Sequence, residues 1–399
     1  MGMENSQVSQ PAHVIVIGAG VLGLAAAREL AVRGNHVTLL DAAGPDRPLA
    51  GASHRSFAWV NANNKPPAAY HRLNAQAIAE HHRLQQELGG TWFHQSGCVL
   101  IAPPDATAER IEWLRSQDYP VWPVPREDLE GLEPAVDWST LPGAALHMPS
   151  EGYLDADLFA AGLTSGLAAR GVEIQKALVT RILPDRVLFD DGTEIRSDAV
   201  VVAAGAASRA FGLPVAAVED APTPRVHSLI GLTAPTDVHL GRVVISERIN
   251  LRPRHDGRLW VQLPDVEHRV AEGTDPAAQD ALLDDVRRIM EAELHAVLGT
   301  TVPVEKVLLS ARSLPEDGFP LVGFTGPARR VYSLVTHSGM TLSALLGRLA
   351  AAEITAELAG KAVPEDSEVA EASDLLATFR PDREQAATPA PSTPFVGRQ

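Results

Sequence analysis

The sequence predicts an α/β fold in which a parallel sheet covered by helices carries an inserted domain of antiparallel strands. Three observations support this prediction: a glycine-rich strand–turn–helix near the N-terminus, two later buried apolar strands, and a middle block of alternating apolar and polar residues. The buried strands are expected at 198–204 and 331–334, and the alternating block at 214–304. Continuous apolar strands between helices are typical of parallel sheets, whereas alternation is typical of half-buried antiparallel strands.

The first element is a strand, a tight turn, a helix and a second strand in direct succession. In a G-x-G-x-x-G turn the first glycine permits the turn, the second lets the backbone approach a pyrophosphate, and the third lets the helix pack closely. The helix N-terminus offers unpaired N–H groups to phosphates. A glycine-rich unit that binds no ligand is disfavoured, because an acidic residue that could bind a ribose also stands at the end of the second strand. The residues concerned are strands 14–17 and 36–40, helix 24–33, Gly18, Gly20, Gly23 and Asp41.

The composition excludes several classes of protein. The chain has 399 residues, enough for two domains, and its net charge of -16 opposes non-specific binding to nucleic acid. No apolar run approaches the roughly 20 residues needed to span a bilayer, and no signal peptide is visible, so a cytoplasmic protein is expected. Cys98 is the only cysteine, which excludes an internal disulfide and a cysteine-rich metal site. We expect no metal.

The remaining elements follow from local patterns. Helical periodicity alternates with short apolar runs, and Asp190-Asp191-Gly192 is a typical hairpin turn. Expected helices are 70–88, 155–170, 279–298 and, after a turn, 336–358, and expected strands are 92–101, 172–179, 186–189, 194–196, 226–232, 243–251 and 259–263.

These elements predict a discontinuous domain organisation. The nucleotide-binding domain is expected at 12–80, 150–213 and 305–362, and the substrate-binding domain at 81–149 and 214–304. Residues 1–11 are expected to form a flexible leader, and the low-complexity end, 380–399, a flexible tail.

Two C-terminal motifs carry a resemblance to a known family. The sequence DGFPLVGF at 317–324 is followed by a short strand and by HSGMTLSALLGRL at 337–349. With the N-terminal glycine turn, these motifs resemble the D-amino acid oxidase family of FAD-dependent oxidoreductases, which includes glycine oxidase, sarcosine oxidase and D-amino acid dehydrogenase. The resemblance covers roughly residues 12–360. It implies a Rossmann-like FAD-binding domain with an inserted antiparallel-sheet (α+β) substrate domain, and it favours FAD over NAD.

The resemblance also implies which residues bind the cofactor. Asp41 would bind the adenosine ribose, Val179 would meet the adenine through its backbone, and Gly205 would end the strand beneath the cofactor. The loop with Ser53, His54 and Ser56 would follow the pyrophosphate and flavin edge. Backbone N–H groups of the next four residues would face the flavin N1/C2 carbonyl edge: Ser338, Gly339, Met340 and Thr341.

We expect the FAD to be non-covalent. Some members attach FAD through a cysteine close to the 317–324 motif, but the corresponding stretch here has Ser310 and no cysteine. Other members use a histidine after the first βαβ unit, and His54 is displaced by one residue from that place.

The implied activity is oxidation of a C–N bond, with a hydride passing from the carbon next to nitrogen to flavin N5. The substrate would be an amino-acid-like or secondary amine. The electron acceptor would be oxygen or another oxidant. Both acceptors stay open because no lysine lies at 251–263, where sarcosine oxidases carry the lysine that assists the reaction with oxygen. Two alternatives stay open. One is oxidation of a cyclic amine or biosynthetic intermediate without a carboxylate, and the other is a non-catalytic flavin electron-transfer subunit.

Three residues are candidates for substrate contacts. Arg312 lies five residues before Asp317, where the family places the arginine that binds a substrate carboxylate; otherwise it is a surface arginine or pairs with Glu316 or Asp317. His337 would orient the substrate or make a structural hydrogen bond to a backbone carbonyl. Arg252 would be a second anion contact, unless the face that it shares with Asn250 and Arg254 is solvated.

Overall fold

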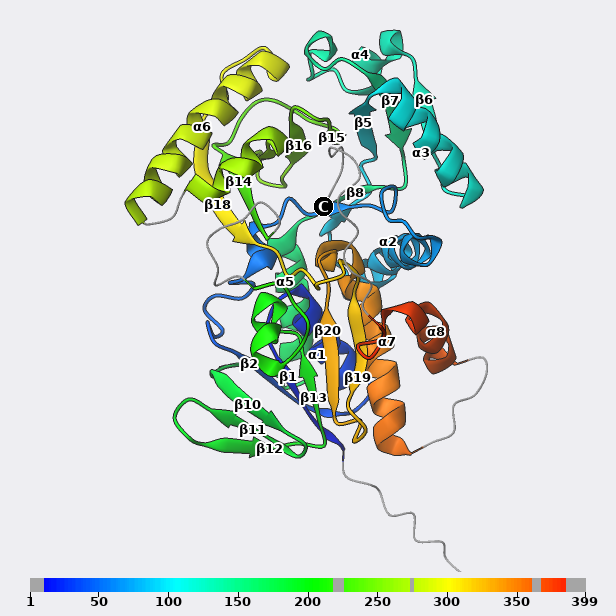
Figure 1. Cartoon of the computed structure of the whole chain (residues 1–399), viewed down its shortest axis with the longest axis vertical. Helices are drawn as coiled ribbons and strands as arrows, with labels where there is room; N and C mark the ends of the chain where they lie inside the picture. Colours follow the sequence, from blue (N-terminus) through cyan, green and yellow to red (C-terminus); the bar gives the residue numbers. More distant parts are fainter. Residues whose placement is uncertain (1–10, 218–225, 273–275, 361–366, 385–399) are drawn as a thin grey trace, which may run out of the picture.

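The structure is a computed structural model that describes residues 11–217, 226–272, 276–360 and 367–384. It contains a six-stranded sheet and an eight-stranded sheet, one above the other along the long axis of the molecule (Figure 1). The mixed α/β architecture confirms the predicted fold class. Most of the expected leader, and the expected tail after residue 384, lie outside the described residues.

The six-stranded sheet is the predicted parallel sheet. Its order is β19-β20-β13-β1-β2-β9, and every neighbouring pair is parallel except β19 and β20. The apolar runs are buried on both faces: Val14 and Val16 share a core with the helices, whereas Ile15 and Ile17 pack with Val179 and Val187 of a small three-stranded sheet. The strands are β1 (His13–Ile17), β2 (His36–Asp41), β9 (Ile174–Lys176), β13 (Ala199–Val202), β19 (Leu321–Thr325) and β20 (Val331–Val335).

Two helices cover the centre of this sheet and pack tightly on each other. They are α1 (Val21–Val32), which begins three residues earlier than expected, and α7 (Gly339–Ala359). A Cβ atom on Gly347 would lie 2.8 Å from the backbone carbon of Ala25, so the contact requires glycine. The surrounding helices are α2 (Ala68–Leu88), α5 (Ala156–Ala168) and α8 (Glu368–Leu375).

The eight-stranded sheet has the order β18-β14-β17-β16-β15-β5-β7-β6. Its pairs are antiparallel, as predicted, except that β15 and β5 are parallel. Helix α6 (Pro276–Leu298) packs against it. The strands are β5 (Cys98–Ala102), β6 (Trp122–Val124), β7 (Ala144–Met148), β14 (His227–Thr233), β15 (Val243–Ile245), β16 (Asn250–Pro253), β17 (Leu259–Gln262) and β18 (Val304–Ala311).

Several element predictions need correction. The expected strand 92–101 is two strands, β4 (Phe93–His94) and β5, which belong to different sheets. The expected strand 243–251 is likewise divided into β15 and β16 by a turn. Helices α3 (Pro104–Ser116) and α4 (Leu129–Leu132) were not predicted.

Two small sheets complete the fold. One joins β10 (Val179–Leu183), β11 (Arg186–Phe189) and β12 (Glu194–Arg196), and it contains the predicted hairpin. The other joins β3 (Trp59–Val60), β8 (Gly152–Leu154) and β4.

The structure adds two facts to the predicted domain boundaries. Strand β18 lies in the eight-stranded sheet, although residues from 305 onward were assigned to the nucleotide-binding domain. Arg380 forms an ion pair with Glu353, and Arg383 forms one with Asp317, so the expected flexible tail does not begin at residue 380. The division into domains stays a prediction.

Within the described ranges, none of the helices has both the length and the apolar character needed to cross a bilayer.

Candidate cofactor and substrate site

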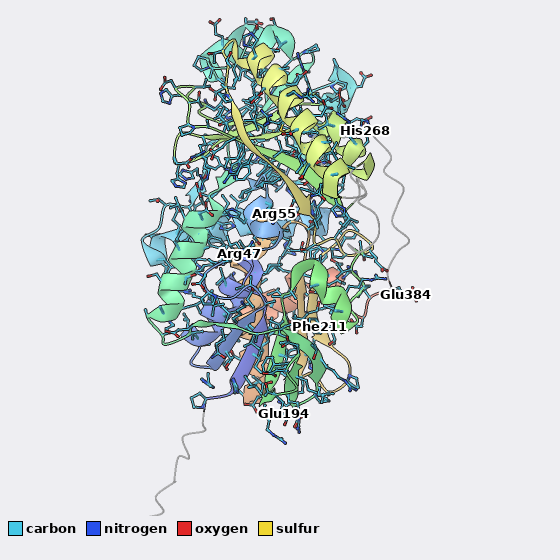
Figure 2. The ribbon with its side chains drawn as sticks, turned by 90° about the vertical axis from the view of Figure 1, so that its left-hand side faces the viewer. Arg47, Arg55, Glu194, Phe211, His268 and Glu384 are labelled. Atoms are coloured by element: carbon cyan, nitrogen blue, oxygen red, sulfur yellow. The ribbon has the colours of Figure 1, made fainter. Side chains whose placement is uncertain are left out.

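A cavity of about 530 Å³ lies between the two sheets. It begins at the carboxyl ends of the parallel strands, where Ile17, Asp41 and Thr336 line it, and it reaches the eight-stranded sheet at Ser228. Ligands of open α/β sheets bind at this edge. In Figure 2 two lining residues, Arg55 and Phe211, lie between helix α6 at the top and Glu194 at the bottom.

The glycine turn forms one wall of the cavity. Gly18 has a φ of +104°, and a Cβ atom there would lie 2.5 Å from the carbonyl oxygen of Ala203. Both Gly18 and Gly20 line the cavity, but a Cβ atom on Gly20 would meet only Ser53 Oγ, at 3.3 Å. A Cβ atom on Gly23 would lie 1.8 Å from the Gly18 carbonyl oxygen. Gly20 therefore leaves space on the cavity side, and Gly23 permits the helix to pack on the turn.

Asp41 lines the cavity at the tip of β2. Its Oδ2 atom accepts a hydrogen bond from the Ala19 N–H at 2.7 Å, and its Oδ1 atom accepts one from the Ala43 N–H at 2.8 Å. Carboxylate oxygens have two acceptor positions each, so Asp41 retains the capacity to accept ribose hydroxyl groups.

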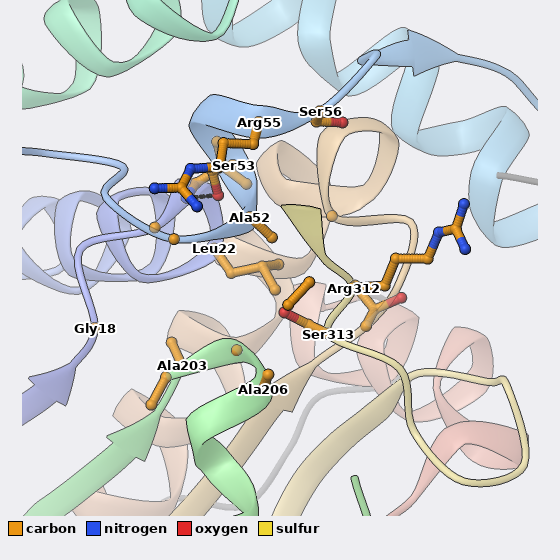
Figure 3. Close-up of a pocket in the computed structure, with 18 of the residues that line it drawn as sticks. Gly18, Leu22, Ala52, Ser53, Arg55, Ser56, Ala203, Ala206, Arg312 and Ser313 are labelled. Atoms are coloured by element: carbon orange, nitrogen blue, oxygen red, sulfur yellow. Dashed lines mark hydrogen bonds between the residues drawn. The ribbon is translucent and has the colours of Figure 1, made fainter. Parts of the chain in front are cut away.

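The loop between β2 and β3 lies above the glycine turn. Ser53 Oγ accepts a hydrogen bond from the Val21 N–H at 3.3 Å, and Ser53 and Ser56 both line the cavity. His54 is not among the described residues that line it: its Nδ1 atom contacts Asp157 Oδ1 at 3.2 Å on the outer side. Figure 3 shows Ser53 and Arg55 on one side of the cavity, opposite Ala203 and Ala206.

Two further predicted contacts line the cavity below this loop. They are Val179, at the start of β10, and Gly205, which follows β13. Gly205 has a φ of +58°, and a Cβ atom there would lie 2.8 Å from Ser313 Oγ. The backbone therefore passes close to the segment that follows β18.

The N-terminus of α7 points into the same cavity as that of α1. Ser338, Gly339, Met340 and Thr341 all line it. Ser338 is held by three hydrogen bonds: its Oγ contacts Lys65 Nζ at 3.1 Å and the Tyr70 hydroxyl at 2.7 Å, and its N–H donates to Thr336 Oγ1 at 3.1 Å. Two helix N-termini thus direct positive dipole ends toward one cavity.

Lys65 is a buried cation at this end of the cavity that sequence reasoning missed. Burial lowers the pKa of its ammonium to about 8, although Glu151 opposes the shift. A single lysine in a non-periodic segment gives no local signal of burial. Its position adds positive potential to the α7 N-terminus.

A buried carboxylate fixes the segment that follows β3. Glu151 accepts hydrogen bonds from Trp59 Nε1 at 3.1 Å, from the Ala62 N–H at 3.1 Å and from the Asn63 N–H at 3.0 Å. The Asn61 side chain between them lines the cavity. Its buried Oδ1 atom has no hydrogen-bond partner within the described part of the chain. This oxygen is an acceptor available for a ligand.

Arg312 lies at the edge of the cavity, directly after β18 (Figure 3). Its Nη2 atom donates to both oxygens of Glu267, at 2.8 and 2.9 Å, and its Nη1 atom donates to the His227 carbonyl at 3.0 Å. Its side chain is only 16% exposed, so it is not a surface arginine. Glu316 pairs with Arg209, and Asp317 pairs with Arg383.

Arg252 is buried among aromatic rings. Its side chain is 2% exposed, and its guanidinium lies 5.2 to 5.9 Å from the ring centres of Phe57, Tyr153 and Trp260. It donates to the Phe57 carbonyl and is not among the described residues that line the cavity. The expectation of a solvated face is therefore wrong, and an anion contact by Arg252 stays a prediction. Burial lowers its pKa to about 10.

His337 lines the cavity beside Arg312 and Lys65. Burial and these two cations lower the pKa of its imidazole to about 3. The ring is therefore neutral at neutral pH, with one N–H donor and one acceptor nitrogen.

Residues of the eight-stranded sheet form the side of the cavity opposite the glycine turn, and sequence reasoning missed them; besides Ala311 of β18 there are four. Their polar members come from strands that lie side by side only in the folded sheet. Isolated serines and glutamines on strands are otherwise typical of solvated positions. They are Ser228, Ile230, Gln262 and Ser310.

The cavity fits FAD on three observations. Two helix N-termini face it, Gly20 leaves the backbone open on the cavity side, and the buried Asn61 Oδ1 lacks a partner among the described residues. A dinucleotide requires anion-binding backbone N–H groups, and a flavin ring requires polar partners at its edge. No group of three or more His, Cys, Asp or Glu side chains that could hold a metal ion is found in the ranges that the structure describes.

Comparison with known proteins gives one family and several relatives. The family described as FAD dependent oxidoreductase matches residues 13–353. Glycine oxidase from Pseudomonas aeruginosa is 28% identical over 333 residues, which are 78% of this chain and 85% of that protein. The tRNA 5-methylaminomethyl-2-thiouridine biosynthesis bifunctional protein MnmC from Marinobacter nauticus is 27% identical over 61% of this chain, which spans only 39% of that protein.

Solved structures show the same fold. Glycine oxidase from Geobacillus kaustophilus superimposes with a TM-score of 0.72 at 20% identity, covering 94% of this chain and 99% of that one. L-proline dehydrogenase from P. horikoshii superimposes with a TM-score of 0.70 at 18% identity, covering 88% of this chain and 95% of that one.

Proposed function

Because this chain belongs to the family of FAD dependent oxidoreductases, we propose that it oxidises the C–N bond of an amino-acid-like or secondary amine. FAD, when bound, would supply the hydride acceptor for the carbon next to nitrogen. The observation that carries the proposal is Arg312, a cation at the edge of the cavity beside the α7 turn. The relative named glycine oxidase from Pseudomonas aeruginosa supports an amino acid as substrate.

The chain would hold the cofactor at both ends of the cavity. The glycine turn and the α1 N-terminus offer N–H groups to the pyrophosphate, and Asp41 offers acceptors to the ribose. At the other end, the α7 N-terminus and Lys65 create positive potential. Positive potential stabilises the negative charge that a reduced flavin carries.

The substrate would bind between the α7 turn and the eight-stranded sheet. A carboxylate at Arg312 fixes one end, and the neutral His337 can exchange hydrogen bonds with the amine without repelling it. Ser228, Gln262 and Ser310 supply polar contacts from the sheet. These residues position the substrate and restrict access of water. No general base is required beyond the one that removes the proton of the substrate ammonium before hydride transfer.

A substrate without a carboxylate, such as a cyclic amine, is the second candidate. The observation that favours it is the pairing of Arg312 with Glu267, which already neutralises the guanidinium. A non-catalytic electron-transfer subunit is the third reading, and anaerobic mixing separates it from the others, because the flavin of an enzyme bleaches when its amine substrate is added.

Substitution of Arg312 tests the proposal. With an amino acid substrate, we expect Arg312→Ala to lower kcat/KM by about 2–4 kcal/mol, the cost of removing one partner of a partly buried ion pair. Arg312→Lys should also lose activity, because an ammonium keeps the charge but not the planar fork. The control is the decarboxylated amine, for which both variants should retain activity. Equal losses on the two substrates would contradict the carboxylate role and favour the cyclic amine.

A further inference from the structure

We propose that Glu267 competes with a ligand carboxylate for Arg312 and thereby favours substrates that carry a cationic group beside their carboxylate. The inference rests on the proposed function, because it assumes that Arg312 receives the substrate carboxylate. It assigns to Glu267 the role of a specificity-determining residue.

The contact between the two side chains involves the atoms that would hold a ligand. Both oxygens of Glu267 accept hydrogen bonds from Nη2 of Arg312, at 2.8 and 2.9 Å. The Nη1 atom donates to the carbonyl of His227 at 3.0 Å. Both terminal nitrogens of Arg312 therefore already serve protein oxygens. A ligand carboxylate must displace Glu267 or share the guanidinium with it.

Glu267 is held in this position from a second side. Gln262 is 4% exposed and lines the cavity, and its Nε2 atom donates to Glu267 Oε1 at 2.7 Å. The Oε1 atom of Gln262 accepts in turn from Asn250 Nδ2 at 3.3 Å, and these two residues are register partners on β17 and β16. The side chains of Arg312 and Glu267 are 16% and 17% exposed. The pair is thus part of a connected network that reaches the cavity.

The charges of this network predict selectivity. With Glu267 ionised, the pair has no net charge, so a simple monocarboxylate gains little Coulomb energy from Arg312. Two carboxylates that share one guanidinium also repel each other. A ligand with an additional cationic group avoids this cost, because Glu267 then has a second partner. The pair therefore discriminates against singly charged anions and accepts a zwitterionic substrate end.

The test uses binding to the oxidised holoenzyme without turnover. Acetate, acetamide and glycine betaine are titrated while the flavin absorbance is recorded; betaine combines a carboxylate with a fixed cation and has no N–H group. The variants are Glu267→Gln, which keeps the size and an acceptor oxygen, and Arg312→Ala. The matched control is Glu305→Gln, which removes a carboxylate from the Glu305–Arg258 pair at the opposite end of β18.

We expect Glu267→Gln to tighten acetate binding by about fivefold or more, as befits removal of a partly screened competing charge. In Glu267→Gln, the affinity for betaine should fall relative to that for acetate, and the affinity for acetamide should not change. The Glu305→Gln variant should bind all three ligands as the unsubstituted protein does. If Arg312→Ala abolishes acetate binding while Glu267→Gln leaves it unchanged or weaker, the inference is overturned. If Arg312→Ala also leaves acetate binding unchanged, the carboxylate role of Arg312 itself fails. Equal melting temperatures of the variants exclude a loss of folding as the cause.

Discussion

The three glycines of the first turn have different roles at the scale of single residues. A Cβ atom on Gly23 would lie 1.8 Å from the Gly18 carbonyl oxygen, which no rotation of a side chain can relieve. A Cβ atom on Gly20 would have only Ser53 Oγ within contact, at 3.3 Å, and the Gly20 backbone is extended. Gly23 therefore serves folding, whereas Gly20 leaves space for a ligand.

This difference predicts that alanine affects FAD binding at one position and folding stability at the other. Gly20→Ala should leave the free energy of unfolding of the FAD-free protein nearly unchanged and weaken FAD binding by about tenfold or more, since a methyl group would occupy the approach path of the pyrophosphate. Gly23→Ala should destabilise the FAD-free protein itself by about 3 kcal/mol or more. Denaturant unfolding and FAD titration measure the two quantities. Normal FAD affinity in Gly20→Ala would contradict the assignment of the phosphate site.

Arg252 and Arg312 show what residue patterns can and cannot predict. The alternation of Asn250 and Arg252 places these two side chains on one face of β16, but it does not predict whether that face is buried, and Arg254 lies beyond the end of the strand. Burial depends on Phe57, Tyr153 and Trp260, which come from distant segments. The family resemblance implies a place for Arg312 at the substrate, whereas its partner Glu267 lies 45 residues away in sequence. Such partners are invisible to local reasoning.

At the scale of elements, the contact between α1 and α7 determines the geometry of the cofactor site. Both helices begin at the cavity, and they meet where Gly347 faces Ala25. A Cβ atom on Gly347 would lie 2.8 Å from both the backbone carbon and the Cβ of Ala25. The separation of the two helix N-termini therefore depends on the absence of a side chain at one position.

We expect Gly347→Ala to destabilise the protein by about 1–3 kcal/mol through overpacking, even though alanine favours helices, and to weaken FAD binding because the N-termini move apart. The matched control is Gly166→Ala in α5, where a Cβ atom would meet nothing closer than Leu88 Cδ2 at 3.6 Å. That variant should be unchanged or more stable by about 0.5–1 kcal/mol. Denaturant unfolding measures both. Equal stability changes in the two variants would show that the helix contact adapts.

The elements that were predicted correctly have strong local signals. Strands β1, β2, β13 and β20 are continuous apolar runs, and α2 and α6 are long periodic segments. The failures have physical causes as well. The run 92–101 changes sheet at a bend where Gly97 has a φ of +77°, and α3 begins at Pro104 within a proline-rich segment that masks its periodicity. Polar residues of β14, β17 and β18 reach the cavity only after long-range pairing of these strands.

At the scale of the whole molecule, the cavity joins parts of the chain that are far apart in sequence. Its lining residues come from the glycine turn, the 50–61 loop, the β13 end, the eight-stranded sheet and the α7 turn. A ligand that contacts all of these segments binds only the folded chain. By mass action it adds about 2.7 kcal/mol of stability at a concentration one hundred times its dissociation constant.

The same arrangement predicts that FAD is held without a covalent bond. Cys98 is fully buried within β5 of the eight-stranded sheet, where burial raises the pKa of its thiol well above the usual range, so no thiolate is available. His54 is near the cavity, but its ring contacts Asp157 on the outer side. Acid precipitation of the holoenzyme should therefore release the yellow colour into the supernatant. Excess FAD should then raise the melting temperature of the FAD-free protein, and it should raise that of Gly20→Ala by a smaller amount at the same concentration. Flavin retained in the pellet would contradict the prediction, and a loss of that retention in His54→Ala would identify the attachment site.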